Sequence, residues 1–223
     1  MAKNKPKKEP KEKNFYDVYQ VKKLLDVLEN ESIKYKILIV LALDSGARRS
    51  EICALRWSDI DLDTRMVSIT KSLKVVEGVI DEKTTKTESS IRTIKLSEST
   101  INLIKEYKKW QEAYKLVNKQ RWIGKDDRVF TALNGDYMFP GTCDHILRKI
   151  VKKYNLDSTC FHELRHTCAS LLINSGVDPK TVSKRLGHSD TSITMEIYTH
   201  AFEESKNACA DRFDEMMKKL EMA

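Results

Sequence analysis

The sequence predicts an α+β fold that is mainly helical and carries one small antiparallel β-sheet. Apolar residues recur at helical spacing through most of the chain, and short runs of β-branched residues gather between positions 66 and 96. A length of 223 residues with 40% hydrophobic composition is enough for a sizeable core. No internal repeat or linker-like segment is evident after residue 14. We therefore expect one domain over residues 15–223, preceded by a tail over 1–14.

The tail carries much of the positive charge. The formal net charge is +7, and residues 1–13 supply +4 of it through six lysines and two glutamates. This lysine- and proline-containing segment is typical of a disordered basic linker. The remaining +3 is compatible with a polyanionic partner but does not by itself distinguish one from an ordinary solvated surface.

Membrane and secreted classes are disfavoured. The longest apolar run, residues 37–43, is far shorter than the roughly 20 residues that span a bilayer, and the N-terminus lacks an apolar signal region. The five cysteines form an odd set without a C-x-x-C pair, which argues against a disulfide framework and a cysteine-built zinc site. A cytoplasmic protein with reduced cysteines is expected.

The chain from Phe15 to about Trp57 is predicted to be helical. Its second helix, over residues 33–43, is apolar almost all round and should therefore be buried. Ser45-Gly46 ends that helix, and a short helix follows whose start lies near Arg48. Three β-like runs come next, at 66–70, 73–80 and 91–96, with a turn at Gly78; a small antiparallel sheet is the simplest arrangement for them.

The second half of the chain is predicted to be helical again. Ser97 and Glu98 open a long helix whose apolar and aromatic stripe is more typical of core than of a base-stacking platform. A turn is expected at Asn134-Gly135-Asp136. Further helices are expected over 142–154, 160–175, 179–186 and 191–197, and an amphipathic helix within 202–223, its stripe formed by Cys209, Phe213, Met216 and Leu220.

Two charged segments stand out as candidate sites. Arg48 follows directly on the buried helix, where it could form an ordinary surface pair with Glu51 three residues on. His162 and Arg165, three residues apart on a helix, share one face and can converge on a single anion.

The second segment also matches H-E-x-x-H, the zinc-protease signature. His162 and His166 would be the ligands and Glu163 the base. The metzincin extension would require Gly and His where Ala169 and Leu172 stand, and the arginine inside the motif would place a cation beside the metal. Zinc hydrolysis is therefore a disfavoured alternative.

A third segment completes a recognisable set. Gly187-His188 is followed ten residues later by Tyr198. Together with the two segments above, this order resembles the tyrosine recombinase, or phage integrase, family, whose members carry an arginine box, an H-x-x-R box, an L-G-H box and a terminal tyrosine. The resemblance covers residues 15–202, and it implies the tyrosine-recombinase catalytic fold.

The resemblance also implies roles for individual residues. Arg48 and Arg165 match the two catalytic arginines, His162 and His188 lie beside the phosphate, and Tyr198 is the nucleophile. The family further uses a hairpin lysine a few residues before a strand of the type seen at 91–96. Lys86 fits that spacing best, and Lys83 remains the alternative.

These residue types suit one reaction. Two guanidinium groups can stabilise the charge that develops on a phosphodiester under attack, so that neither a metal nor a nucleotide cofactor is needed. Tyr198 must lose a proton as it attacks, and His162 could accept it; Lys86 could protonate the leaving 5′ hydroxyl, while His188 donates a hydrogen bond to the phosphate. The product is a covalent 3′-phosphotyrosine link that conserves the energy for religation. Glu51 would orient this cationic cluster.

The function expected is therefore site-specific DNA recombination, with a non-catalytic DNA-binding module as a further alternative. The expected partners are double-stranded DNA and other recombinase protomers in a synaptic complex, whereas the isolated domain should be monomeric. The helix within 202–223 could dock on its own molecule or on a neighbouring protomer. Family members generally carry a core-binding domain before this one, and only the basic tail precedes residue 15 here, so strong site-specific binding by this chain alone is not expected.

Overall fold

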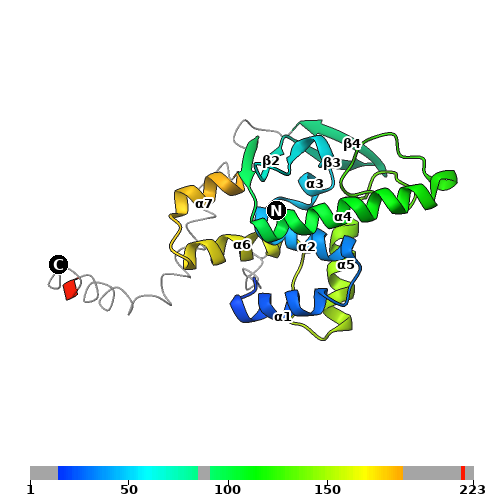
Figure 1. The fold of residues 1–223 in the computed structure, drawn as a ribbon. Helices are drawn as coiled ribbons and strands as arrows, with labels where there is room; N and C mark the ends of the chain where they lie inside the picture. The colour runs from blue at the N-terminus through cyan, green and yellow to red at the C-terminus, as the bar shows by residue number, and fades with distance from the viewer. Residues whose placement is uncertain (1–14, 85–90, 188–216, 219–223) are drawn as a thin grey trace, which may run out of the picture.

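The computed structural model describes residues 15–84, 91–187 and 217–218, which form a mainly helical fold with small antiparallel sheets (Figure 1). In chain order the elements are α1 (Val18–Leu28), α2 (Ile33–Ser45), α3 (Arg49–Ile52), η1 (Trp57–Asp59), β1 (Ile60–Asp61), β2 (Met66–Ile69), β3 (Lys71–Val76), β4 (Val79–Thr84), β5 (Arg92–Lys95), α4 (Glu98–Val117), η3 (Lys119–Arg121), α5 (Pro140–Lys153), α6 (Glu163–Asn174) and α7 (Pro179–Leu186). The predicted tail over 1–14 and the predicted helix over 191–197 lie outside the described residues, as does most of the predicted helix within 202–223.

Helix α2 lies at the centre of the core, as its all-apolar sequence predicts. It packs against α1, α4, α5 and α6, and its buried residues include Ile37, Leu38, Ile39, Leu41 and Ala42. The helix ends at Gly46, which adopts the left-handed conformation with φ +60°. This abrupt end lets the chain turn and start α3 at once, so that Arg48 stands at the edge of the core.

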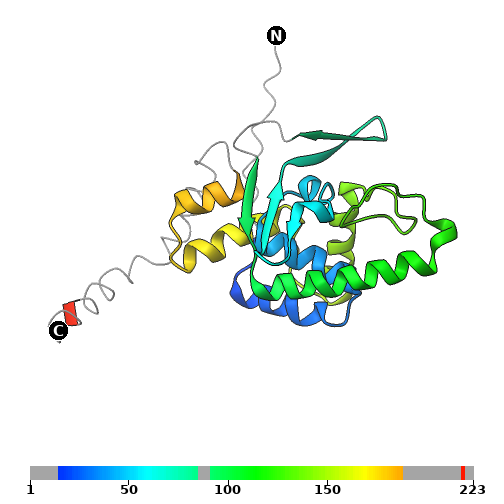
Figure 2. The ribbon, with the colours of Figure 1, turned by 45° about the horizontal axis from the view of Figure 1, so that its top comes forward.

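The long helix α4 begins at the predicted position. The Ser97 hydroxyl accepts a hydrogen bond from the Thr100 backbone N–H and so caps the helix. Tyr107 is buried and stacks on Phe130 at 5.6 Å between ring centroids, which places this part of the stripe in the core. Val117 is exposed because the far end of the helix projects past α1 and α2 (Figure 2).

The predicted strands are antiparallel, but they form two sheets where the sequence predicts one. β1, β2 and β5 make a three-stranded sheet, and β3 and β4 make a separate hairpin whose turn projects from the body, although β3 contacts α3 (Figure 2). The predicted run 73–80 is divided because Glu77 and Gly78 both have positive φ, 51° and 80°. A two-residue turn of that kind matches the strand twist and pairs Val76 with Val79, so the run folds back on itself.

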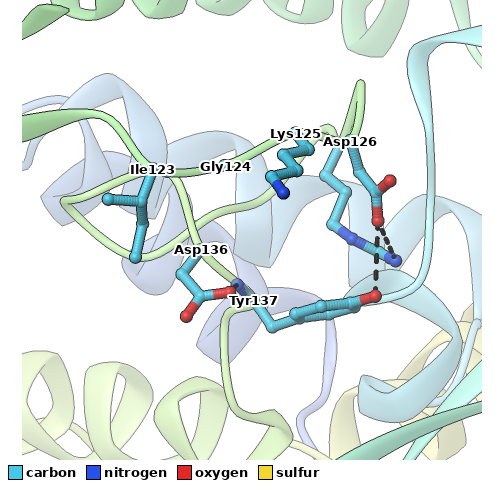
Figure 3. A pocket seen from close by; sticks show the side chains of 8 residues that line it. Ile123, Gly124, Lys125, Asp126, Asp136 and Tyr137 are labelled. Carbon is cyan, nitrogen blue, oxygen red and sulfur yellow. Dashed lines mark hydrogen bonds and ion pairs between the residues drawn. The ribbon is translucent and has the colours of Figure 1, made fainter.

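One carboxylate of the hairpin, together with the buried Leu73 of β3, joins it to the body. Glu82 on β4 accepts hydrogen bonds from Arg56 and Arg128 and pairs with Lys71. Arg128 is itself buried, donates to Asp126 at 2.9 Å and lies 3.9 Å above the ring of Tyr137. Figure 3 shows Asp126 held between these two side chains, beside a pocket of about 280 Å³ that is lined by Ile123, Gly124, Lys125, Asp126, Arg128, Gly135, Asp136 and Tyr137.

Burial opposes the charge on Glu82, but the hydrogen bonds from Arg128 and Lys71 outweigh it and lower the pKa of this carboxyl. The carboxylate is therefore ionised at neutral pH and holds strand β4 by charge.

Among the helices of the described ranges, none combines the length and the apolar composition that crossing a membrane requires.

Gly46 provides a test of how tightly the end of α2 is packed. An added Cβ would lie 2.2 Å from Leu186 Cδ2 on α7, and the positive φ disfavours any side chain. Gly46→Ala should therefore lower the free energy of unfolding by about 2–4 kcal/mol, the sum of strain and overpacking. Gly176→Ala is the matched control, because its φ is also positive but an added Cβ meets nothing within 4 Å. Urea unfolding would measure both; equal losses would contradict the clash.

Candidate active site

Three chain segments that are distant in the sequence meet at one end of α2. The α2–α3 junction supplies Arg48, the start of α6 supplies His162 at the N-cap and Arg165 in the first turn, and the end of α7 supplies Gly187. They meet because α6 packs on both α2 and α7. Helices α6 and α7 lie side by side in both views (Figures 1 and 2). The fold thus brings together the described parts of all three segments that the sequence singles out.

Arg48 is held in a defined orientation at the start of α3. Its backbone N–H and its Nη1 each donate a hydrogen bond of 2.8 Å to the Glu51 carboxylate. Its Nη2 lies 3.5 Å from the Gly187 carbonyl oxygen. The side chain nevertheless remains 36% exposed. The guanidinium group is therefore oriented by the protein and still accessible from solvent.

Arg165 is the more deeply buried of the two arginines. It is 2% exposed, and its Nη1 donates a 2.7 Å hydrogen bond to the Gly46 carbonyl oxygen. Burial, and next the positive charge of Arg48, lower the pKa of this guanidinium to about 9. An anion bound beside both arginines would relieve this repulsion, so the site is electrostatically suited to a phosphate group.

Glu51 is shared by two arginines. Its side chain is 2% exposed, and besides Arg48 it accepts hydrogen bonds from Arg92 Nη2 at 2.8 Å and Arg92 Nη1 at 3.3 Å. Burial would raise the pKa of this carboxyl, but the hydrogen bond and charge of Arg92, followed by those of Arg48, lower it. The pair with Arg48 therefore exists, as the sequence allows, but it is anchored in the interior rather than lying on the surface.

Arg92 is the residue that the sequence reading missed. It belongs to the run predicted as the last strand, where it occupies an inward position: the residues of β5 alternate between buried and exposed, beginning with Arg92. An arginine at an inward strand position requires a buried partner. That alternation is the sequence signal that could have identified it.

His162 precedes the first turn of α6, and its side chain is accessible from solvent. Its ring centroid lies 5.0 Å from that of His166, with the rings perpendicular. Although the side chain can be reached by solvent, the neighbouring protein atoms desolvate part of the ring and lower the pKa of this imidazole, and the positive charges of Arg165 and Arg48 lower it further. A neutral imidazole at pH 7 can accept a proton, which is the role that the sequence suggests for it.

The described residues do not support the alternative of a zinc site at His162 and His166. Within the ranges that the structure describes, no group of three or more His, Cys, Asp and Glu side chains could hold a metal ion. The Arg165 guanidinium also lies close enough to His162 to lower its pKa. A cation in this position disfavours a metal at His162 and His166.

The remaining predicted site residues lie at or beyond the edges of the described ranges. Lys83 is on β4, where its Nζ pairs with Asp81 at 3.1 Å and its side chain is half-exposed. Lys86, His188 and Tyr198 lie outside the described residues. Their roles stay predictions, and so does the choice between the two lysines.

Comparison with known proteins assigns the chain to a family. The sequence model of the phage integrase family matches residues 14–205. The chain belongs to the phage integrase family. Among its curated relatives are a XerC-like tyrosine recombinase of Caldanaerobacter subterraneus subsp. tengcongensis, 31% identical over 88% of this chain, and the ICEBs1 integrase of Bacillus subtilis, 27% identical over 93%. This chain spans 53% and 56% of those two proteins, so it corresponds to about half of their length.

Solved structures agree with the family assignment. The Tn1549 transposon integrase in complex with transposon right end DNA has a TM-score of 0.74 and 27% identity, covering 93% of this chain and 67% of that one. XerA recombinase has a TM-score of 0.71 over 90% of this chain and 66% of that one, and at 19% identity it supports the fold alone. The predicted tyrosine-recombinase catalytic fold of this phage integrase family member is confirmed.

The electrostatics around His162 can be tested directly. Its imidazole should titrate below the usual value of about 6.5 and be neutral at pH 7, because burial and the arginine charges favour the uncharged ring. Since the unfolded chain then binds this proton more readily than the folded one, His162 should make the fold less stable as the pH falls below about 6.5.

An NMR titration of the imidazole C–H resonances measures this pKa. Arg48→Gln should raise it toward the usual value by removing one nearby cation, whereas Arg121→Gln on η3 is a matched control that should leave it unchanged. A pKa above 6.5 in the unsubstituted chain would contradict the assignment of His162 as a neutral base.

Proposed function

We propose that this chain is the catalytic part of a site-specific DNA recombinase that cleaves and rejoins strands through a covalent 3′-phosphotyrosine intermediate. The observation that carries the proposal is the convergence of two arginines from distant segments. Arg48 is held by the Glu51 carboxylate, and Arg165, which is held by the Gly46 carbonyl, lies close enough for the charge of Arg48 to lower its pKa. The membership of the phage integrase family supports it.

The proposed reaction is an exchange at phosphorus. The Tyr198 oxygen attacks the scissile phosphate, the bond from phosphorus to the 5′ oxygen breaks, and a phosphotyrosine bond forms in its place. The tyrosine proton passes to His162, and Lys86 gives a proton to the leaving 5′ oxygen. Religation reverses both transfers, with a 5′ hydroxyl from the other duplex as the nucleophile.

The arginines act on the phosphate itself. Arg48 is accessible and oriented, so it can donate paired hydrogen bonds to the non-bridging oxygens. Arg165 is buried beside it and supplies positive charge that solvent does not screen. Together they stabilise the charge of the transition state without a metal ion, and His188 contributes a further hydrogen bond.

The proposed partners are double-stranded DNA and further copies of the recombinase. The complex of the Tn1549 transposon integrase with transposon DNA supports the first. The exchange of strands between two duplexes requires several protomers, and the amphipathic stripe predicted within 202–223 offers a surface by which they could associate. A cytoplasmic location, where DNA is accessible and cysteines stay reduced, fits the free thiols of Cys53, Cys143 and Cys168.

Covalent trapping tests the proposed reaction. The chain is incubated, with EDTA present, with a pool of nicked duplexes whose sequence is randomised on both sides of the nick, so that loss of the short cleaved strand traps the intermediate. A protein–DNA adduct should form, and Tyr198→Phe should abolish it. Arg48→Ala and Arg165→Ala should bind DNA nearly normally but form adduct at least roughly 100-fold more slowly.

Gel electrophoresis under denaturing conditions detects the adduct, and filter binding measures the affinity. An unsubstituted chain that binds the pool but yields no adduct would favour the DNA-binding module instead. Adduct formation that requires a divalent metal would contradict the two-arginine mechanism.

A second experiment identifies the general acid. Lys86→Ala should slow cleavage of an ordinary phosphodiester, but it should cleave normally a substrate whose 5′ bridging oxygen is replaced by sulfur, because a thiolate leaves without a proton. Lys83→Ala, three residues earlier in the chain and on β4, is the matched control, and it should be close to the unsubstituted chain on both substrates. Rescue of Lys83→Ala by sulfur, rather than of Lys86→Ala, would reverse the assignment.

A further inference from the structure

Arg92 makes a set of contacts that joins three elements of the candidate active site. Its Nη1 and Nη2 donate to the two oxygens of Glu51 on α3, and its Nε donates at 2.8 Å to the Arg185 carbonyl oxygen in the last turn of α7. Its own backbone belongs to β5, which pairs with β2 and contacts α7. Arg48 bonds to the same carboxylate and lies 3.5 Å from the Gly187 carbonyl oxygen at the C-cap of α7.

The contacts of Arg92 differ from those expected of an arginine that binds a substrate phosphate. The Arg92 side chain is 6% exposed, and each of its three guanidinium nitrogens already donates to a protein oxygen. Arg48, in contrast, is 36% exposed and presents its guanidinium at the surface. Arg92 therefore acts through Glu51, whereas Arg48 is the group that can meet a substrate.

The charge balance explains why a second arginine is needed. Glu51 is almost completely buried, and a buried carboxylate with a single, partly exposed partner would favour protonation or movement toward solvent. Arg92 supplies the inner partner, so that Glu51 stays ionised and keeps both oxygens in place. One of these oxygens accepts from the Arg48 backbone and the other from its guanidinium, so fixing Glu51 also fixes the direction of Arg48.

We propose that Arg92 is a positioning residue for the recombination reaction, which orients the phosphate-binding Arg48 through Glu51 and ties it to the end of α7. The proposal rests on the function proposed above. It adds a residue that lies on the strand β5, outside the three segments that the sequence singles out. The bond to the Arg185 carbonyl extends the effect to Gly187, whose carbonyl faces Arg48.

A double-mutant cycle distinguishes positioning from general support of the fold. Arg92→Leu should slow adduct formation by about 10- to 100-fold while DNA affinity stays within about threefold, as is typical when a residue that orients a functional group is removed. In a Glu51→Gln background the same substitution should cost less than about threefold, because the group through which it acts has gone. Arg92→Lys, which keeps the charge but loses the paired geometry, should fall between.

Gln111→Leu is the matched control. Gln111 is as buried as Arg92 and bonds to Trp57 and Val129, far from the site in the hydrogen-bond network, so its loss should lower stability without slowing the adduct step. Equal adduct rates for Arg92→Leu and Gln111→Leu would overturn the proposal. A loss in the Glu51→Gln background as large as in the unsubstituted chain would also overturn it.

An NMR measurement keeps this test separate from that of the proposed function. The Nε–Hε resonance of Arg48 reports how firmly its guanidinium is held, with or without DNA cleavage. Arg92→Leu should broaden it or speed its exchange with water, and Gln111→Leu should not. If the unsubstituted chain forms no adduct, the recombinase function fails while this resonance still decides the role of Arg92; an unchanged resonance in Arg92→Leu refutes that role.

Discussion

The carboxylate of Glu51, shared between Arg48 and Arg92, is the interaction on which the geometry of the site depends. A buried ion pair contributes little net stability, because desolvation of the charges offsets their attraction. What it provides here is direction: both carboxylate oxygens are fixed from the inside, so a guanidinium at the surface is held in one orientation before any substrate arrives. Such preorganisation is what electrostatic stabilisation of a transition state requires. Arg165 adds a third cation, the most deeply buried of the three. The three arginines carry more charge than the Glu51 carboxylate neutralises, so the cluster favours an anion.

The arginines of the site also bind the ends of helices. Arg165 donates to the carbonyl of Gly46 after α2, and Arg92 and Arg48 approach carbonyls at the end of α7. Arg185 in turn donates to the carbonyl of Asp44 in the last turn of α2. Carbonyl groups at helix C-termini lack partners within the helix and carry partial negative charge, so they are natural acceptors for arginine. The arginines therefore donate hydrogen bonds to carbonyl groups at the ends of α2 and α7. These bonds hold the two helix ends close together at the site.

The β3–β4 hairpin contains a second carboxylate that is shared between two arginines, at a distance from the site. Glu82 accepts hydrogen bonds from Arg56 and Arg128 much as Glu51 accepts them from two arginines, and this charged contact holds the hairpin against the body together with the buried side chain of Leu73. Lys83, one of the two lysines that the sequence singles out, follows Glu82 directly on β4. The charged contact adds to a limited apolar one: Leu73 and Ile80 pack with the core, whereas Val75, Val76 and Val79 are exposed.

The sequence by itself determined the fold class, most helices, the start of α4 at Ser97 and the family, because these follow from local spacing, capping residues and short motifs. It also singled out Arg48, His162 and Arg165; that Arg48 meets the other two was indicated by the resemblance to the family alone, and no local spacing in the chain could show it. The division of the strands into two sheets and the role of Arg92 were decided by the tertiary structure. Strand pairing and the partner of a buried charge depend on which distant segments meet, and neither has a periodic signature in the chain; only packing of α6 and α7 against the end of α2 brings those groups within hydrogen-bonding distance.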